Sequence, residues 1–418
     1  MGDGRNSRLG AALLVALVAV ASAGIVLWPT GDGTTAVAGR RVTIEPKAPP
    51  TPLEQVEALL EAQVDALTKG DETGWLAPVD AKLQPRYRAI FRNLRALEIS
   101  YTKLTIEQLP ATAGSMSVGF QLDYCFSTQL CRDGGGNPNV GYKLTWKPRG
   151  SSYVITGMTG SGKENYLQPA PWENTQLAFA TGRRVIVAAP PSQRKHLNRV
   201  LQVAEKAAAV ADRYAGYTGN PQARYRVYLA DNKSWNSWYG GKYPAWSVAY
   251  QLPLGRVGGD VVVRISEMPS SNKELTTIIQ HELAHVVTRA SSTNYDEEED
   301  LWLIEGIAEY IGFLPAKPGA TYNKDLLSYS FGQRGDLKTV VVKPLTAKSD
   351  DLTVATLYAT GHFAAGCMAA KYGDKKLLDF VDRVVQLGEE LDPASRAAFG
   401  TPFKSVDKAC VSWIKQRT

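Results

Sequence analysis

The stretch His281-Glu282-Leu283-Ala284-His285 places two imidazoles four positions apart, with a carboxylate next to the first. On an α-helix, residues four apart lie one above the other with Cβ atoms about 6 Å apart, so both rings can bind one ion. Zinc in a hydrolytic site takes three protein ligands and keeps one position for water. The pattern predicts His281 and His285 as Zn²⁺ ligands and Glu282 as a general base.

The residues around this motif predict a buried helix. Ser271 and Glu274 match the capping box that begins many helices, and an apolar stretch follows. Its mostly apolar positions are Leu275, Ile278, Ile279, Ala284, Val286 and Val287. The alternative is a pair of ordinary core histidines, but the chain has only 4 histidines in 418 residues, which makes a chance match rare.

A third ligand is expected on a following helix. The apolar segment 301–310 contains Glu305, which falls twenty positions after His285. In this respect the chain resembles the gluzincin metallopeptidases, the group that contains thermolysin and the zinc aminopeptidases, where the motif is followed by a liganding Glu. The resemblance implies that Glu305 is the third zinc ligand and that Glu309, one turn further on, orients His281.

The same resemblance implies the fold of residues 167–418, a mixed sheet with an active-site helix and a helical C-terminal subdomain. The expected order is a strand at 184–189, a helix at 197–214 and a strand at 225–230, followed by β-like runs at 245–252 and 260–266. In gluzincins the strand before the zinc helix is the sheet edge that pairs with an extended peptide. This role is therefore expected for 260–266.

Peptide hydrolysis also needs a donor that stabilises the oxyanion of the tetrahedral intermediate. Tyr358 and His362 lie four apart on an expected helix that continues to Tyr372, so both can face a cleft. Resemblance to related membrane-associated peptidase-like families favours Tyr358. Tyr295 is a weaker candidate, and plain core packing is the alternative for Tyr358 and His362.

The N-terminus indicates export. Residues 9–28 carry no charge and follow Arg5 and Arg8, which predicts a single transmembrane anchor with residues 1–8 as a cytoplasmic tail. The alternative is a signal peptide cleaved near Ala21-Ser22-Ala23, which would make the protein secreted. Residues 29–52 form an expected Pro-rich stalk, and the catalytic part is expected outside the cytoplasm at the cell membrane.

The four cysteines agree with export. Four cysteines allow three disulfide connectivities, and the preferred one pairs Cys125 with Cys131 and Cys367 with Cys410.

Residues 53–166 are expected to form a separate α+β domain. An amphipathic helix from residue 53 to Gly70 and a second one at 85–97 precede four strand-like runs at 98–106, 117–126, 140–146 and 152–156. Helices followed by a strand meander resemble the nuclear-transport-factor-like cone. Such a cone can hold a ligand or mediate contacts, so no chemistry is assigned to it.

Two classes of partner are excluded. The net charge of +6 is spread thinly along 418 residues, which argues against nucleic-acid binding. Residues 157–163 match much of a phosphate-binding loop, but Glu164 stands where Ser or Thr would hold Mg²⁺, which argues against nucleotide binding.

The sequence thus predicts an α+β, membrane-anchored, extracytoplasmic zinc metallopeptidase acting on a peptide or protein. The alternative is a non-enzymatic envelope protein that keeps the zinc-bound scaffold for binding, although such a protein would not need Glu282. The Gly-x-Met-Glu-Asn segment of zinc aminopeptidases is missing before Ser271, which favours an endopeptidase or a narrow-specificity processing enzyme.

Overall fold

The computed structural model describes residues 49–110, 114–127, 136–160, 167–241, 247–255, 258–289, 299–346 and 348–418. Residues Pro50–Thr418 form one compact unit. The expected tail 1–8, the apolar run 9–28 and nearly all of the expected stalk 29–52 lie outside the described residues.

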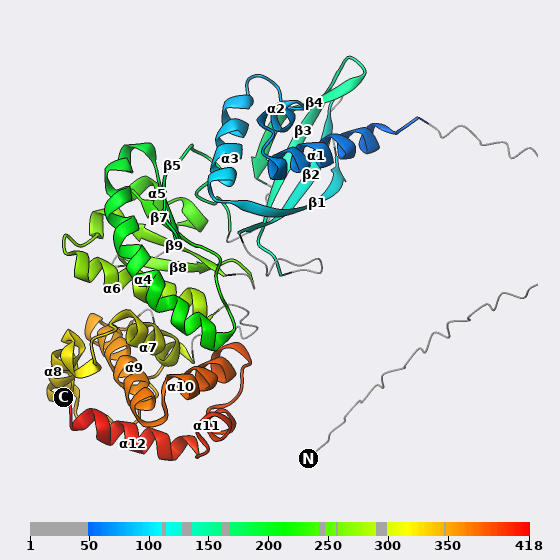
Figure 1. Cartoon of the computed structure of the whole chain (residues 1–418). Helices are drawn as coiled ribbons and strands as arrows, with labels where there is room; N and C mark the ends of the chain where they lie inside the picture. Colours follow the sequence, from blue (N-terminus) through cyan, green and yellow to red (C-terminus); the bar gives the residue numbers. More distant parts are fainter. Residues whose placement is uncertain are drawn as a thin grey trace, which may run out of the picture. The chain divides into compact units, whose positions relative to one another are not determined.

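The first part of the unit consists of three helices followed by an antiparallel sheet (Figure 1). The helices are α1 (Pro52–Lys69), α2 (Glu72–Leu76) and α3 (Gln84–Ala96). The strands β1 (Ile99–Leu109), β2 (Met116–Phe126), β3 (Asn139–Arg149) and β4 (Ser152–Gly160) pair in sequence order. This is the expected order of helices and meander, and the likeness to a nuclear-transport-factor-like cone stays a prediction.

The limits of α1 follow from its end residues. Thr51 accepts a hydrogen bond from the backbone N–H of Glu54, whose carboxylate accepts one from the N–H of Thr51 in return. This capping box satisfies two backbone donors that the first turn leaves without partners. Gly70 ends the helix at a φ of 77°, a conformation that glycine adopts without steric strain.

The second part contains a mixed five-stranded sheet in the order β5-β6-β7-β9-β8. Its strands are β5 (Ala178–Thr181), β6 (Val185–Ala189), β7 (Tyr225–Ala230), β8 (Ala249–Pro253) and β9 (Gly259–Arg264). The central strands β6, β7 and β9 are parallel, whereas β5 and β8 pair antiparallel with their neighbours. The sheet is therefore mixed, as the sequence predicted.

Both faces of this sheet are buried, because alternate side chains of each strand enter different apolar cores. Val185 and Val187 pack with the helices α4 (Leu197–Thr218) and α6 (Asn272–Thr288), whereas Ile186 and Ala188 join the core of the first part. The central strands are accordingly almost continuously apolar.

The edge strands of this sheet are β5 and β8, and β9 is not at an edge, which corrects the expectation for residues 260–266. The strand directly before α6 is β9, and it lies between β7 and β8 inside the sheet. The chain forms β8 first and then returns antiparallel to it as β9. The edge strand β8 therefore comes before β9 in the sequence. Hairpin pairing thus leaves residues Ala249–Pro253 with a neighbouring strand on one side only among the described residues.

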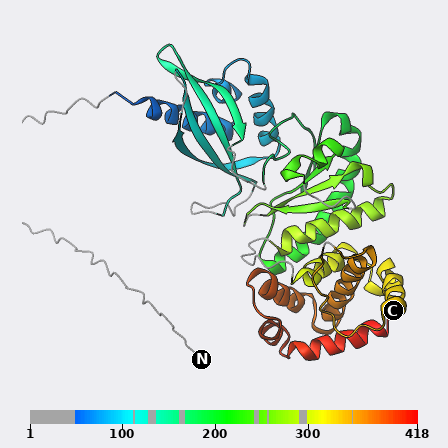
Figure 2. The ribbon, with the colours of Figure 1, turned by 180° about the vertical axis from the view of Figure 1, so that it is seen from behind.

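The rest of the chain is helical. It contains α7 (Leu301–Gly312), α8 (Tyr322–Arg334), α9 (Asp351–Tyr372), α10 (Asp374–Val381), α11 (Leu391–Phe399) and α12 (Phe403–Lys415), and a short helix α5 (Asn232–Trp235) follows β7. Figures 1 and 2 show α4 and α6 between the five-stranded sheet and this helical part. A disulfide joins Cys367 of α9 to Cys410 of α12, as predicted. Cys131 lies outside the described residues.

One apolar core connects the first part to the second sheet. Asn93 of α3 is fully buried beside it, and its amide donates to the carbonyls of Trp172 at 2.9 Å and Thr175 at 2.6 Å. The amide oxygen of Asn93 accepts the N–H of Leu177 at 2.9 Å. These bonds fix the connecting segment on α3. The predicted boundary between 53–166 and 167–418 stays a prediction, because residues 161–166 are not described.

The interior of the first part is nearly filled. Its cavity has a volume of about 20 Å³ and is lined by side chains such as Trp75, Tyr87 and Tyr142. That volume suits about one water molecule and no organic ligand.

The fold class predicted from the sequence included a transmembrane helix, and this part of the prediction needs correction. Residues 9–28 lie outside the described residues, and within the described part no helix combines the length and apolarity needed to cross a bilayer. The 22-residue helices α4 and α9 are long enough, but Glu205 and Lys206 interrupt α4, and polar residues such as His362 interrupt α9. Within the described residues the fold class is therefore α+β with two sheets, and the expected membrane-spanning helix has no support there.

Candidate metal centre

Helix α6 carries the two histidines of the motif. Ser271 begins it by accepting a hydrogen bond from the backbone N–H of Glu274 at 3.4 Å. Leu275, Ile279 and Leu283 anchor the helix in the core shared with the five-stranded sheet. With that face fixed, the opposite face presents His281 and His285 to a cleft.

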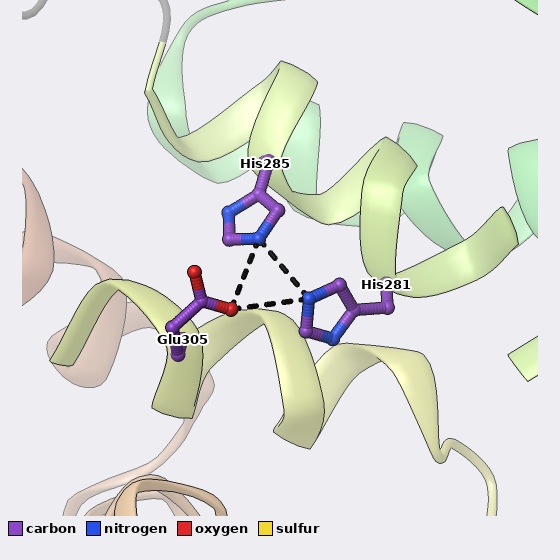
Figure 3. A group of neighbouring side chains, drawn as sticks. All are labelled: His281, His285 and Glu305. Carbon is purple, nitrogen blue, oxygen red and sulfur yellow. Dashed lines mark hydrogen bonds and ion pairs between the residues drawn. The ribbon is translucent and has the colours of Figure 1, made fainter. Parts of the chain in front are cut away.

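Helix α7 brings Glu305 to the same point (Figure 3). It packs closely on α6, since a Cβ atom on Gly312 would lie 3.0 Å from the Cβ atom of His281. Glycine at this position lets the two helices approach, and Glu305, about two turns earlier on α7, points its carboxylate at the histidines.

The three proposed ligand atoms form a nearly equilateral triangle (Figure 3). The Nε2 atoms of His281 and His285 are 3.1 Å apart, and Oε2 of Glu305 lies 3.3 Å from the first and 3.4 Å from the second. Tetrahedral bonds of about 2.0–2.1 Å from Zn²⁺ to nitrogen and oxygen separate two ligand atoms by about 3.3 Å. The arrangement fits a zinc ion.

The electrostatics of the site also suit a cation. Burial lowers the pKa of His285, and it outweighs the opposing carboxylate of Glu305. Burial acts the same way on His281, but hydrogen bonds with Glu305 and Glu309 raise its pKa well above the usual range. The pKa of Glu305 is lowered despite burial by the histidines. The carboxylates of Glu305 and Glu309 beside His281 therefore favour a cation at this point.

Glu309 lies where the resemblance implied. Its Oε1 atom is 3.1 Å from Nδ1 of His281, on the side of the ring away from Glu305. A carboxylate there fixes the tautomer of the imidazole, because Nδ1 must carry the proton and Nε2 is left with its lone pair.

Glu282 lies in the cleft and is 7% exposed. Burial raises its pKa to about 7, although the charge of His281 opposes this shift. The backbone N–H of Gln251, on the edge strand β8, donates a hydrogen bond to the carboxylate. This backbone contact was not predictable from the sequence, because it depends on how β8 lies against α6.

The cleft has a volume of about 600 Å³. The edge strand β8 and helix α6 supply part of its wall, and helices α7, α8 and α9 supply the rest. Arg289, one turn beyond His285, and Asp351 are charged residues of this wall outside the metal centre. The space is large enough for several residues of an extended peptide.

The two candidates for the oxyanion donor have different surroundings. Tyr358 lines the cleft, and its ring stacks on that of His281 with centroids 6.3 Å apart. His362 is fully buried behind the centre, stacked on Phe313, and does not line the cleft. Tyr295 lies outside the described residues. Of the two described candidates, only Tyr358 can face a substrate.

Asn323 is a residue of the site that sequence reasoning missed. It lies in the first turn of α8, and its amide nitrogen donates to Oε2 of Glu309 at 2.8 Å. The preceding Pro318-Gly319-Ala320-Thr321 segment reads as a loop, and a single Asn after it carries no spacing signal.

Comparisons with known proteins add little. No family model and no curated protein matches the chain. Among solved structures, it is similar to a variant of a two-domain M1 zinc metallopeptidase bound to L-arginine, with 17% identity and a TM-score of 0.33. The match covers 76% of this chain and 64% of that one, less than two thirds of its length. This likeness is coarse.

Proposed function

We propose that the protein is a zinc-dependent peptidase in which His281, His285 and Glu305 hold the metal. The observation that carries the proposal is the triangle of ligand atoms, with sides of 3.1, 3.3 and 3.4 Å at the wall of an open cleft. Bound zinc polarises a carbonyl and makes a water molecule nucleophilic near neutral pH.

Glu282 is the proposed general base. Its carboxylate belongs to the cleft wall, next in sequence to His281, and the raised pKa of about 7 suits a group that both takes up and returns a proton. It would accept a proton from the attacking water and deliver it to the leaving amine. The N–H of Gln251 holds the carboxylate in place for both transfers.

Tyr358 is the proposed donor to the oxyanion of the tetrahedral intermediate. Tyr358 is half-buried and its hydroxyl interacts with Glu305, and burial, reinforced by the nearby carboxylates, raises its pKa well above the usual range. A phenol that stays protonated throughout the working pH range can donate a hydrogen bond at every turnover.

The edge strand β8 supports an extended peptide as substrate. Residues Ala249–Gln251 line the cleft beside Glu282, and β8 has a paired neighbour on one side only. A peptide added to such an edge forms main-chain hydrogen bonds, while pockets select its side chains.

An oxidising, extracytoplasmic location is part of the proposal. The buried disulfide between Cys367 and Cys410 supports it, because structural disulfides persist in oxidising compartments and are rare in the cytosol.

The test is peptide cleavage by the full-length protein and its Glu282→Gln variant, with and without a chelator. A peptide library supplies the substrate, and zinc content is measured on the same samples. We expect Glu282→Gln to lower kcat by about 10²–10⁴-fold while keeping one zinc per chain. Equal cleavage by both proteins, or cleavage insensitive to the chelator, would rule out this chemistry; activity of the wild type on no peptide would favour a binding scaffold.

A further inference from the structure

A chain of polar contacts, one ion pair and two hydrogen bonds, leads from the metal centre into the helical part of the protein. It begins at Nδ1 of His281, which is 3.1 Å from Oε1 of Glu309. The other oxygen of Glu309 accepts the amide of Asn323 at 2.8 Å. The same amide nitrogen lies 2.9 Å from Nδ1 of His362. Four side chains from α6, α7, α8 and α9 are thereby connected.

Chemistry fixes the direction of each bond. An ionised carboxylate only accepts hydrogen bonds, so the atom of Asn323 that faces Glu309 is the NH₂ group. This group has two hydrogens, and the second points to His362. Nδ1 of His362 must then accept, which places its proton on Nε2 and leaves the ring neutral. Donor and acceptor roles are thus unambiguous from His362 to His281.

Because Asn323 and His362 are buried, a change in either residue affects Glu309. Asn323 is 1% exposed, and His362 is not exposed at all. Without Asn323, the Oε2 atom of Glu309 would lose a charge-assisted hydrogen bond that holds the carboxylate in its orientation at the cleft wall. Such a carboxylate turns toward another donor, and this movement releases Nδ1 of His281.

The ring of His362 is itself held rigidly. It stacks on Phe313, at the end of α7, with centroids 5.0 Å apart and planes 8° apart. Phe363 packs against it edge-on, with centroids 5.9 Å apart. The position of its Nδ1 atom is therefore set by α7 and α9, and it gives the amide of Asn323 a fixed second acceptor.

We propose that Asn323 and His362 are positioning residues for the metal centre, which act on His281 through Glu309. His362 thereby has a role as a buried acceptor, in place of the direct role at the substrate that was one of the two alternatives for it. The proposal rests on the zinc site of the proposed function, and it is independent of whether the protein cleaves peptides.

The test measures zinc affinity by competition with a chelator, using the full-length protein. Asn323→Leu removes both donors, and Asn323→Asp places a second carboxylate against Glu309. We expect each to weaken zinc binding by about tenfold or more. His362→Leu removes the acceptor, and we expect it to weaken zinc binding too. His362→Gln should bind zinc as the wild type does, because the side-chain carbonyl of Gln can accept a hydrogen bond from Asn323.

Thr360→Val is the matched control. Thr360 lies on α9 two positions before His362, is equally buried, and its hydroxyl has no hydrogen-bond partner in the described part of the chain. We expect wild-type zinc affinity for it. A cobalt(II)-loaded sample adds a readout that a loss of stability alone does not change: the visible spectrum shifts in Asn323→Leu and not in Thr360→Val.

Wild-type affinity and an unchanged cobalt spectrum in both Asn323→Leu and His362→Leu would overturn the positioning role and leave the zinc site standing. A wild-type chain that binds no zinc would overturn the proposed function and this inference together. If Asn323→Leu does not fold, the nearly isosteric Asn323→Asp variant takes its place with the same expected result.

Discussion

Gly306 on α7 and Gly361 on α9 meet so closely where their helices cross that neither position accepts a side chain. A Cβ atom on Gly306 would lie 2.6 Å from the carbonyl carbon of Gly361. Glu305 is next to the first glycine, and Tyr358 is one turn before the second. The close crossing thus brings the proposed oxyanion donor against the proposed metal ligand.

Gly306→Ala should therefore destabilise the protein. Overpacking of a tight contact lowers the free energy of unfolding by about 1–3 kcal/mol, measurable by urea denaturation. Gly332→Ala on α8 is the control, since a Cβ atom there meets nothing within 4 Å. Because Ala favours helices over Gly by about 1 kcal/mol, that variant should be as stable as the wild type or more so. Equal loss in both variants would contradict the packing argument.

Tyr358→Phe should lower kcat by roughly 100-fold, because it removes a donor to the developing oxyanion and keeps the ring. Zinc content and the affinity for substrate should change little. Tyr322→Phe, on the α8 side of the same cleft, is the control and should keep the wild-type kcat. Steady-state kinetics on one peptide decide the matter, and an undiminished kcat in Tyr358→Phe would remove this residue from the reaction.

His362 should make the stability depend on pH. Burial lowers its pKa to about 4, against about 6.5 in an unfolded chain. Between these values the unfolded chain binds a proton that the folded one does not, so stability falls as the pH falls. The loss from pH 6.5 down to 4 amounts to about 3 kcal/mol. Urea unfolding in the presence of a chelator should show that the free energy of unfolding falls with pH in the wild type, and falls less in His362→Gln. The same dependence on pH in both proteins would contradict a buried neutral ring.

The disulfide between Cys367 and Cys410 should stabilise the helical part. It closes a loop across a sequence separation of 43, for which chain entropy gives about 4 kcal/mol as an upper value. Unfolding in urea with and without a reductant measures the difference. A Cys410→Ser variant should match the reduced wild type and lose its response to the reductant. Unchanged stability on reduction would show that packing alone holds α12 on α9.

Local patterns were sufficient to predict the centre of the site. The spacing of His281 and His285 and the cap at Ser271 depend on one helix, and Glu305 followed from a resemblance in the spacing of a single downstream residue. The structure brings His281, His285 and Glu305 together. Their roles as ligands stay predictions until a metal is measured.

Features that depend on tertiary packing were not predictable. The sheet edge was assigned to the strand before α6, because sequence order does not reveal that this strand, β9, lies between β7 and β8. Asn323 was missed because α8 has no clear apolar period, and His362 kept two interpretations because spacing alone cannot tell a cleft from a core. The membrane-spanning expectation rested on residues 9–28 alone and found no counterpart among the described helices.

Zinc content per chain tests the central claim most directly. The wild-type protein, His285→Ala and Glu305→Gln are dialysed against trace zinc, and the bound metal is measured by elemental mass spectrometry together with protein concentration. We predict one zinc per wild-type chain, almost none in His285→Ala and a strongly reduced content in Glu305→Gln. One full equivalent of zinc in His285→Ala would contradict the ligand set and the chemistry built on it.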